Sequence, residues 1–386
     1  MSTEFIKMVA DLSERRFLRT IESLAATNTP CGILFAPQIS QNSRAIVDSF
    51  KNTGLNMNCI CVLVEEQKQF FNTTENEMLV TLEEFPNLNS KPKFIFVLER
   101  YFGTSFMDYF KACGTDMFFL PEINAAEAQY ELYMKHLPEL YDVHQMLADD
   151  KSKEIFRAAI TGRITRIMQD FIFTSEYEYF LNGFLPTAGD IAIDGGSYDG
   201  ETSADFVRQG AKVYAFEMDA ANYRLCITPA KQFGFTIENL GLSNQTGEAF
   251  YSQRGVGSRK LSNDAEDAIM GHFIDLDTYV ERKNIPRIDY IKLDIEGSEL
   301  EALNGAAKTI TRWKPKMAIC VYHKPEDLWT LPTYIKSLRS DYEFQFRHHR
   351  CDRKKEVNGN TYWSVLKYFG VNYRTPSEYD MILYCR

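Results

Sequence analysis

The sequence predicts an α/β protein built from mostly parallel sheets. Two observations predict this class. Short apolar runs of strand type alternate with helix-like segments in both halves of the chain, and several runs in the second half end in an acidic residue followed by a glycine turn. A helix-rich stretch without strand-like runs separates the halves, so we expect two domains joined by a connector.

The composition is that of a globular protein. The 386 residues are 45% hydrophobic and 25% charged, which is ample for two cores. The net charge is -10 and no long basic block occurs, so nucleic acid is disfavoured as the main partner. The stretch 347–355 is locally basic. We expect a solvated loop there, with a site for an acceptor phosphate as the alternative.

Cysteine usage and the N-terminus suggest a location. The eight cysteines lie mostly inside apolar runs and form no CxxC pair, which argues against zinc and favours free thiols in a reducing compartment. The N-terminus lacks the apolar core of a signal peptide. The longest apolar runs are about six residues, far short of a membrane span. We expect a cytoplasmic protein without a membrane span.

The first half predicts a small Rossmann-like domain over residues 1–123, followed by a helical connector over 124–184. Residues 2–28 have the spacing of one amphipathic helix. Four strand-like runs follow, at 32–36, 59–64, 93–98 and 117–120. Apolar residues at three- and four-residue steps then indicate the connector, and the Gly- and Pro-containing stretch 181–190 marks its end.

The second half, residues 185–386, contains seven strand candidates. The last two are joined by a long polar segment without a clear crossover helix, which predicts an antiparallel pair at one end of an otherwise parallel sheet. We also expect a hairpin at the NQTG turn after residue 243. The seven candidates are 190–194, 212–217, 236–240, 288–294, 316–322, 342–346 and 379–385.

The turn after the first of these strands reads IDGGSYDGETS. Asp194, Gly196 and Gly200 give the spacing D-x-G-x-x-x-G, which differs from the G-x-G-x-x-G of a dinucleotide site. A leading carboxylate repels a pyrophosphate but suits a positively charged ligand, and S-adenosylmethionine carries a sulfonium and an ammonium. The alternative is that Asp194 caps the following helix.

Two further turns complete the expected cofactor site. Glu217 ends the next strand, where an acid can accept two ribose hydroxyls, although it can also be an exposed strand end. Leu240–Gly241–Leu242 forms a small apolar turn suited to flank adenine. The predicted cofactor-binding residues are Asp194, Gly195, Gly196, Ser197, Asp199, Gly200, Glu217, Met218, Gly241, Leu242 and Asp294.

A cluster of acids follows the fourth strand, in the stretch LDIEGSELEAL. Asp294, Glu296 and Glu299 surround Gly297, and clustered carboxylates require a cation or a ligand to relieve their repulsion. Ser298 and Glu299 are better candidates for helix caps than Asp294. His323 follows the fifth strand, where a structural role and a functional role are equally open.

The sequence resembles the FkbM family of S-adenosylmethionine-dependent methyltransferases over roughly residues 185–386. The resemblance is carried by the stretches IAIDGGSYDGETS, AFEMD, NLGLSN, LDTYV, IDYIKLDIEGSELEALNGA and KPKMAICVYHKPEDLW. The resemblance implies a seven-stranded Rossmann-like methyltransferase sheet whose last strand is antiparallel. It implies O-methylation, often of sugar or polyketide hydroxyls. It also implies that Asp194, Gly196, Asp199 and Glu217 line the cofactor site and that Asp294, Glu296 and His323 face the acceptor.

Several points stay open at the level of sequence. The general base is His323, Asp294 or Glu296, or Asp294 and Glu296 hold a divalent cation such as magnesium. The expected partner is a small-molecule or glycan acceptor, with a nucleotide-linked sugar and a homo-oligomer both allowed. The competing functions are a nucleotide-linked oxidoreductase and a non-catalytic S-adenosylmethionine-binding sensor or scaffold.

Overall fold

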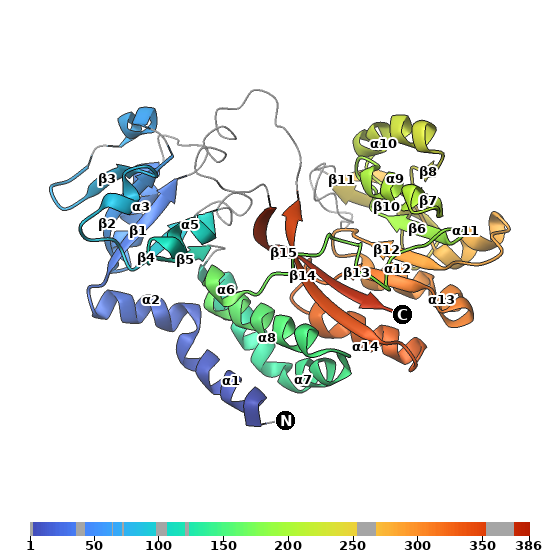
Figure 1. Ribbon diagram of the computed structural model, residues 1–386, viewed down its shortest axis with the longest axis horizontal. Coiled ribbons are helices and arrows are strands. Elements are labelled where there is room, and N and C mark those ends of the chain that lie inside the picture. The colour runs from blue at the N-terminus through green and yellow to red at the C-terminus, as the bar shows by residue number, and fades with distance from the viewer. Residues whose placement is uncertain are drawn as a thin grey trace. The chain divides into compact units, whose positions relative to one another are not determined.

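The computed structural model describes residues 3–35, 43–63, 65–71, 73–97, 106–119, 123–252, 268–352 and 374–386. The chain divides into two compact units. Figure 1 shows the chain coloured by residue number from the N-terminus to the C-terminus. Unit 1 consists of Met1–Tyr141, Glu154–Ser175 and His348–Glu378, and unit 2 of Asp142–Lys153, Glu176–Arg347 and Tyr379–Arg386.

Unit 1 is built on a five-stranded parallel sheet with the strand order β3-β2-β1-β4-β5. The apolar runs predicted as strands form β1, β2, β4 and β5, and their side chains are largely buried because a parallel sheet is covered on both faces. The strands are β1 (Pro30–Phe35), β2 (Asn56–Val62), β3 (Met78–Thr81), β4 (Phe94–Val97) and β5 (Asp116–Phe119).

The expected single N-terminal helix is two helices, α1 (Thr3–Arg15) and α2 (Phe17–Ala26), because Arg16 adopts an extended backbone with ψ of 147°. Its apolar side still packs inward, with Phe17, Ile21 and Leu24 in the core. The other helices of this half are α3 (Ser43–Asn52), α5 (Met107–Ala112), α6 (Ile123–Lys135), α7 (Leu137–Met146), α8 (Asp150–Thr165) and the 3-10 turns η1 (Glu65–Phe70), η2 (Phe85–Asn87) and η4 (Met168–Asp170).

The stretch 124–184, predicted as a connector, contributes residues to both units. The domain boundaries inferred from the sequence stay predictions. Among the described helices, none combines the length and the apolar character needed to cross a bilayer.

The seven-stranded sheet that the sequence predicted is formed mainly by residues of unit 2. The strand order is β14-β15-β13-β12-β6-β7-β8, with β6 between two parallel neighbours and β15 antiparallel to β13. Short runs such as IAIDG and YIKL are buried on both faces, as interior strands of a parallel sheet must be. The strands are β6 (Ile191–Gly195), β7 (Lys212–Phe216), β8 (Thr236–Glu238), β12 (Tyr290–Leu293), β13 (Lys316–Cys320), β14 (Phe344–Asp352) and β15 (Arg374–Cys385).

Helices follow most of these strands, as in other α/β folds. Each strand–helix junction brings a turn to the carboxyl edge of the sheet, which is where the predicted site residues lie. The helices are α9 (Glu201–Arg208), α10 (Ala220–Phe233), α11 (Leu276–Arg282), α12 (Glu299–Gly305), α13 (Ala307–Trp313) and α14 (Asp327–Leu338).

The predicted hairpin at the NQTG turn is wrong. β9 (Gly241–Leu242) and β10 (Gly247–Ser252) are not paired with each other, because β11 (Ala268–Ile274) lies between them in a separate three-stranded sheet. β10 pairs antiparallel and β9 pairs parallel with β11. The NQTG turn therefore connects two strands that lie on opposite sides of β11. β11 supplies backbone hydrogen-bond partners to both of them.

The expectation of a solvated loop from residue 347 is also wrong for its first residues. Arg347, His348 and His349 are buried within β14. In unit 2, the Arg347 guanidinium donates to Ser152 Oγ over 2.6 Å and to the Asp149 carboxylate, which supplies the charge a buried cation requires. Residues 353–355 of the same basic stretch lie outside the described residues.

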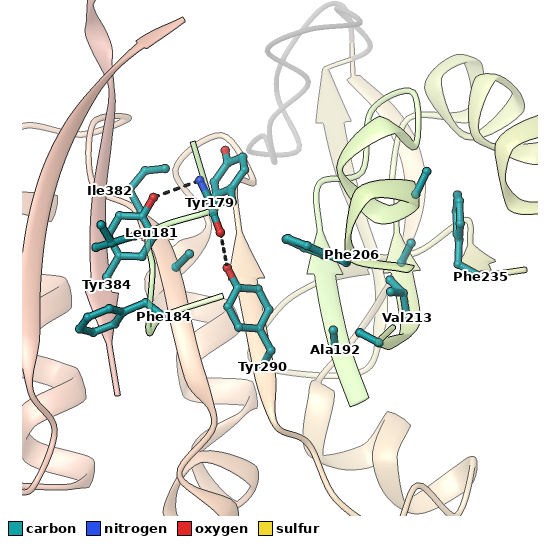
Figure 2. Close-up of a cluster of buried hydrophobic side chains, with 14 of the residues drawn as sticks. Tyr179, Leu181, Phe184, Ala192, Phe206, Val213, Phe235, Tyr290, Ile382 and Tyr384 are labelled. Atoms are coloured by element: carbon teal, nitrogen blue, oxygen red, sulfur yellow. Dashed lines mark hydrogen bonds between the residues drawn. The ribbon is translucent and has the colours of Figure 1, made fainter. Parts of the chain in front are cut away.

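The core of unit 2 holds the backbone of Tyr179 in place. Figure 2 shows Tyr179 beside Tyr384 of β15 and Tyr290 of β12. The Tyr179 backbone N–H donates to the Tyr384 hydroxyl over 3.0 Å, and the Tyr290 hydroxyl donates to the Tyr179 carbonyl over 3.3 Å. These bonds hold Tyr179 at a φ of 64°, a left-handed conformation that a bulky residue adopts only under constraint.

We therefore expect Tyr384→Phe to destabilise the protein. The change leaves the buried Tyr179 N–H without an acceptor, which should lower the free energy of unfolding by about 1–3 kcal/mol. Urea unfolding monitored by circular dichroism measures it. Tyr177→Phe, at a side chain that is 55% exposed, is the matched control and should change stability by less than about 0.5 kcal/mol. Equal stabilities of the two variants would contradict the constraint on Tyr179.

Candidate functional site

Asp194 is fully buried at the end of β6 and points at protein groups. Its carboxylate accepts from the Ser203 hydroxyl over 2.5 Å, and Lys292 Nζ lies 3.0 Å from Asp194 Oδ1. Asp194 does not cap α9, because the N-cap position is Gly200. The carboxylate that leads the glycine turn is thus the buried counterion of a lysine.

Lys292 is a site residue that the predicted site did not include. The side chain is 2% exposed on β12, and Nζ also donates to the carbonyls of Gly195 and Gly196 over 3.0 and 2.6 Å. Burial alone would lower the pKa of Lys292, but the carboxylates of Asp194 and Asp294 outweigh it and raise the pKa above its ordinary range. A lysine inside an apolar strand run was the available signal, since a buried charge requires partners.

Gly196 brings the turn into contact with the end of β12. Its φ is +79°, and a Cβ at this position would lie 1.7 Å from the Asp294 carbonyl oxygen. The Asp294 N–H in turn donates to the Gly195 carbonyl over 3.1 Å. Only glycine fits here. The glycine turn and the acidic cluster, 98 residues apart in the sequence between Gly196 and Asp294, therefore share one junction.

Glu217 closes the turn from the side of β7. Its carboxylate accepts from the backbone N–H groups of Tyr198 over 2.9 Å and Asp219 over 2.8 Å. Burial raises the pKa of Glu217 to about 7 in spite of these two bonds. A carboxylate has lone pairs for about four hydrogen bonds, so two acceptor positions are left for other donors.

The remaining predicted cofactor residues lie around these turns. Ser197 is buried and its hydroxyl contacts that of Ser203 at 3.1 Å, whereas Asp199 accepts from the Glu201 N–H over 3.2 Å. Met218 lies next to Gly241, since a Cβ on Gly241 would be 3.4 Å from the methionine sulfur. Leu242 is buried in β9. The turns after β6 and β7 thus form one connected group.

Asp294 organises the second group. The hydroxyls of Tyr179 and Tyr322 donate to its two oxygens over 2.9 and 3.0 Å. Burial would raise the pKa of Asp294, but Lys292, His323 and the two hydroxyls outweigh it and lower the pKa below the ordinary value. Asp294 therefore keeps its negative charge. Sequence reasoning found Asp294 but neither tyrosine, because nothing in the local pattern links them.

His323 lies among three carboxylates. Its Nδ1 is 2.9 Å from Glu299, and its Nε2 is 3.4 Å from Asp294 and 3.6 Å from Glu296. Burial opposes protonation, but these carboxylates raise the pKa of His323 to about 9, so the imidazole is protonated at neutral pH. Glu299, expected as a helix cap, is fully buried as the closest partner of His323 and accepts from the Ile295 N–H.

The magnesium hypothesis gains no support from this geometry. Among the described residues, the group whose potential ligand atoms lie within 4.8 Å of one another is Glu178, Asp294 and Cys320, without Glu296. Burial raises the pKa of the Cys320 thiol well above its ordinary value, and both Asp294 oxygens already accept tyrosine hydroxyls. Magnesium and calcium prefer sites made entirely of oxygen ligands, whereas this set includes a thiol and lacks Glu296.

The fold and these turns define an α/β domain of the methyltransferase type, and comparisons with known proteins agree. Residues 194–350 match the family model described as the methyltransferase FkbM domain. This match confirms the resemblance to the FkbM methyltransferase family that was seen in the sequence.

Among solved structures, the FkbM methyltransferase from Methylobacillus flagellatus has a TM-score of 0.66 and 19% identity, over 99% of this chain and 98% of that one. It shares the fold of the whole chain. An rRNA methylase from Streptococcus thermophilus has a TM-score of 0.30 and 15% identity, over 52% of this chain and 88% of that one. A methyltransferase from Geobacter sulfurreducens in complex with S-adenosylhomocysteine has a TM-score of 0.26 and 13% identity, over 52% and 84%. A search of curated proteins returned no match.

We expect Lys292→Met to be strongly destabilising, because the Asp194 carboxylate would stay buried without its counterion. The free energy of unfolding should fall by about 3–5 kcal/mol, measured by urea unfolding. In the double variant Lys292→Met/Asp194→Asn no uncompensated charge remains, so part of the loss should be recovered. A decrease of less than about 1 kcal/mol in the free energy of unfolding of Lys292→Met would contradict the description of Lys292 as the required counterion of Asp194.

His323 should make stability depend on pH. Because its folded pKa is raised from 6.5 to about 9, the proton is bound more tightly in the folded state. The resulting stabilisation is complete below about pH 6.5 and is lost as pH rises through about 9, by an amount of the order of 3 kcal/mol. Unfolding free energies across this range should decline more steeply for the wild type than for His323→Gln. His272→Gln, at a side chain that is 68% exposed, is the control and should retain the decline. Parallel curves for wild type and His323→Gln would contradict the raised pKa.

Proposed function

We propose that the chain is an S-adenosylmethionine-dependent O-methyltransferase that methylates a hydroxyl of a sugar or glycan precursor. One observation carries the proposal. The segment that matches the FkbM methyltransferase domain, residues 194–350, contains every predicted cofactor and catalytic residue, from Asp194 to His323. The hydroxyl acceptor and its sugar class are the part of the proposal that only the family resemblance supports.

The residues present fit a cofactor of this shape and charge. The turn Gly196–Gly200 and the acid Glu217 would hold the amino-acid and ribose parts, and Met218, Gly241 and Leu242 would flank the adenine ring. Asp194 pairs with Lys292, and the Lys292 ammonium holds the turn by donating to the carbonyls of Gly195 and Gly196. When bound, the cofactor supplies an electrophilic methyl group on a positively charged sulfur.

On the acceptor side, the charges of Lys292 and His323 keep Asp294 ionised, and this carboxylate would position the acceptor hydroxyl. The carboxylate is fixed by two tyrosine hydroxyls, so it can orient an acceptor hydroxyl, and orientation is the main requirement of an in-line displacement. His323 is protonated near neutral pH and would hold Asp294 and Glu296 in place. It can act as a base only above about pH 9.

Calorimetric titration with S-adenosylmethionine tests the cofactor. The wild type should bind one equivalent in the micromolar range, roughly -8 kcal/mol. Gly196→Ala should abolish binding, because its Cβ would collide with the Asp294 carbonyl. Gly234→Ala is the matched control, since Gly234 has a similar φ of +84° but open space around it, and it should bind as the wild type does. Absence of binding in a folded, cofactor-free sample would refute the proposal.

The acceptor class requires a separate measurement. Transfer of a labelled methyl group to a panel of free and nucleotide-linked sugars should give a product that resists base, as a methyl ether does and a methyl ester does not. Labelled products formed only with amines or RNA would retain the methyltransferase and reject the sugar hydroxyl.

A further inference from the structure

Glu178 lies next to the acceptor side of the site and has no role in the reaction as described so far. It belongs to the segment that precedes β6, directly before Tyr179. Its carboxyl oxygen, an Asp294 oxygen and the Cys320 sulfur lie within 4.8 Å of one another. Within unit 2, Glu178 lies before β6, Asp294 follows β12 and Cys320 ends β13. The Glu178 side chain is only partly exposed.

Two carboxyl groups at this separation do not both ionise without mutual repulsion. Asp294 holds the groups that stabilise a negative charge, namely two tyrosine hydroxyls and the nearby cation of Lys292. Loss of water around Glu178, then the charges of Asp380 and Asp294, raise its pKa well above the ordinary value. The groups facing Glu178 are Tyr179 beside it, Lys292 of β12, Asp294 after β12, Cys320 of β13, Tyr322 after β13, and Asp380 and Tyr384 of β15.

The backbone around this carboxyl pair is strained. Tyr179, Glu296 and Asp380 are non-glycine residues with φ of 64°, 55° and 60°. Such conformations cost of order 1–3 kcal/mol each and persist only where the surrounding structure enforces them, most often at functional sites. These three residues lie in the segments that contain Glu178, Asp294 and Asp380, whose charges act on one another.

We propose that Glu178 is the general base, which takes the proton from the acceptor hydroxyl while Asp294 stays ionised and orients that hydroxyl. The inference rests on the proposed function. The acceptor oxygen forms a bond to the methyl carbon, the carbon–sulfur bond breaks with its electron pair left on sulfur, and the hydroxyl proton passes to the Glu178 carboxylate.

The two carboxyls divide the tasks because their environments differ. A base with a raised pKa holds a proton firmly, whereas Asp294 with its lowered pKa is a weak base. Glu178 must lose its proton before transfer. A positive charge placed beside it favours that loss, since an opposite charge lowers the pKa of a carboxyl. Binding of the sulfonium should therefore prepare the base.

The first test uses the free protein. Difference infrared spectra collected against pH should contain the band of a protonated carboxyl that titrates above the ordinary range of a glutamate and disappears in Glu178→Gln. Glu217 and Asp327, whose pKa values are about 7, also contribute, so the comparison with the variant is essential. Glu176→Gln is the control and should keep the band, and Glu178→Asp should restore a titrating carboxyl. A band unchanged in Glu178→Gln overturns the inference.

The second test measures protons released on binding, by calorimetry near pH 7 in buffers of different ionisation heat. S-adenosylmethionine should release up to one proton from the wild type and none from Glu178→Gln, with affinities within about threefold. S-adenosylhomocysteine, which has the same ribose and adenine but no sulfonium charge, should release none. Binding without proton release overturns the role of Glu178 and leaves the proposed function standing. Absence of binding overturns the proposed function, and the infrared band still decides whether Glu178 holds the proton.

Discussion

The buried pair of Lys292 and Asp194 is the interaction on which the site in unit 2 depends. A lysine taken out of water requires a counterion, and Asp194 supplies it from the adjacent strand β6. The remaining protons of the ammonium bind the carbonyls of Gly195 and Gly196. The Lys292 ammonium therefore fixes the backbone at the point where the glycine turn leaves β6. The positions of the backbone N–H groups in the rest of the turn depend on this point.

The same cation also shapes the opposite side of the junction. Lys292 lowers the pKa of Asp294, which directly follows β12, and lies over the ring of Tyr179 at 5.3 Å from its centroid. Tyr179 in turn donates to Asp294. The turn proposed to hold the cofactor and the carboxylate proposed to orient the acceptor thus share one buried charge. A change in either side alters the field felt by the other, which explains why both lie at neighbouring strand ends.

Sequence reasoning succeeded where the information is local. Strands β6, β7, β12 and β13 are short, mostly apolar runs. Asp194, Glu217, Asp294 and His323 lie at or just after the ends of these runs, so their place at the carboxyl edge could be predicted. The partners could not. Tyr179 lies 115 residues before Asp294 and no periodicity relates them, and the hairpin expected at NQTG failed because a strand from elsewhere, β11, pairs with both of its arms. Lys292 was detectable as a charge in an apolar run, but not the identity of its counterion.

The hydrogen bonds and ion pairs described above determine which of the acids near the carboxyl edge of the sheet are protonated. Four acids near one junction would repel each other if all were ionised. The structure separates them by environment: His323 carries a proton between Glu299, Asp294 and Glu296, and Asp294 stays charged under two hydroxyls. At Glu178, burial and the charges of Asp380 and Asp294 raise the pKa and outweigh the opposing effects of Tyr179 and Lys292. In the reaction proposed above, a positively charged methyl donor is attracted by the ionised members, and its charge lowers the pKa of Glu178 so that the released carboxylate can act as the base. Binding and proton removal are thereby linked through the same set of side chains.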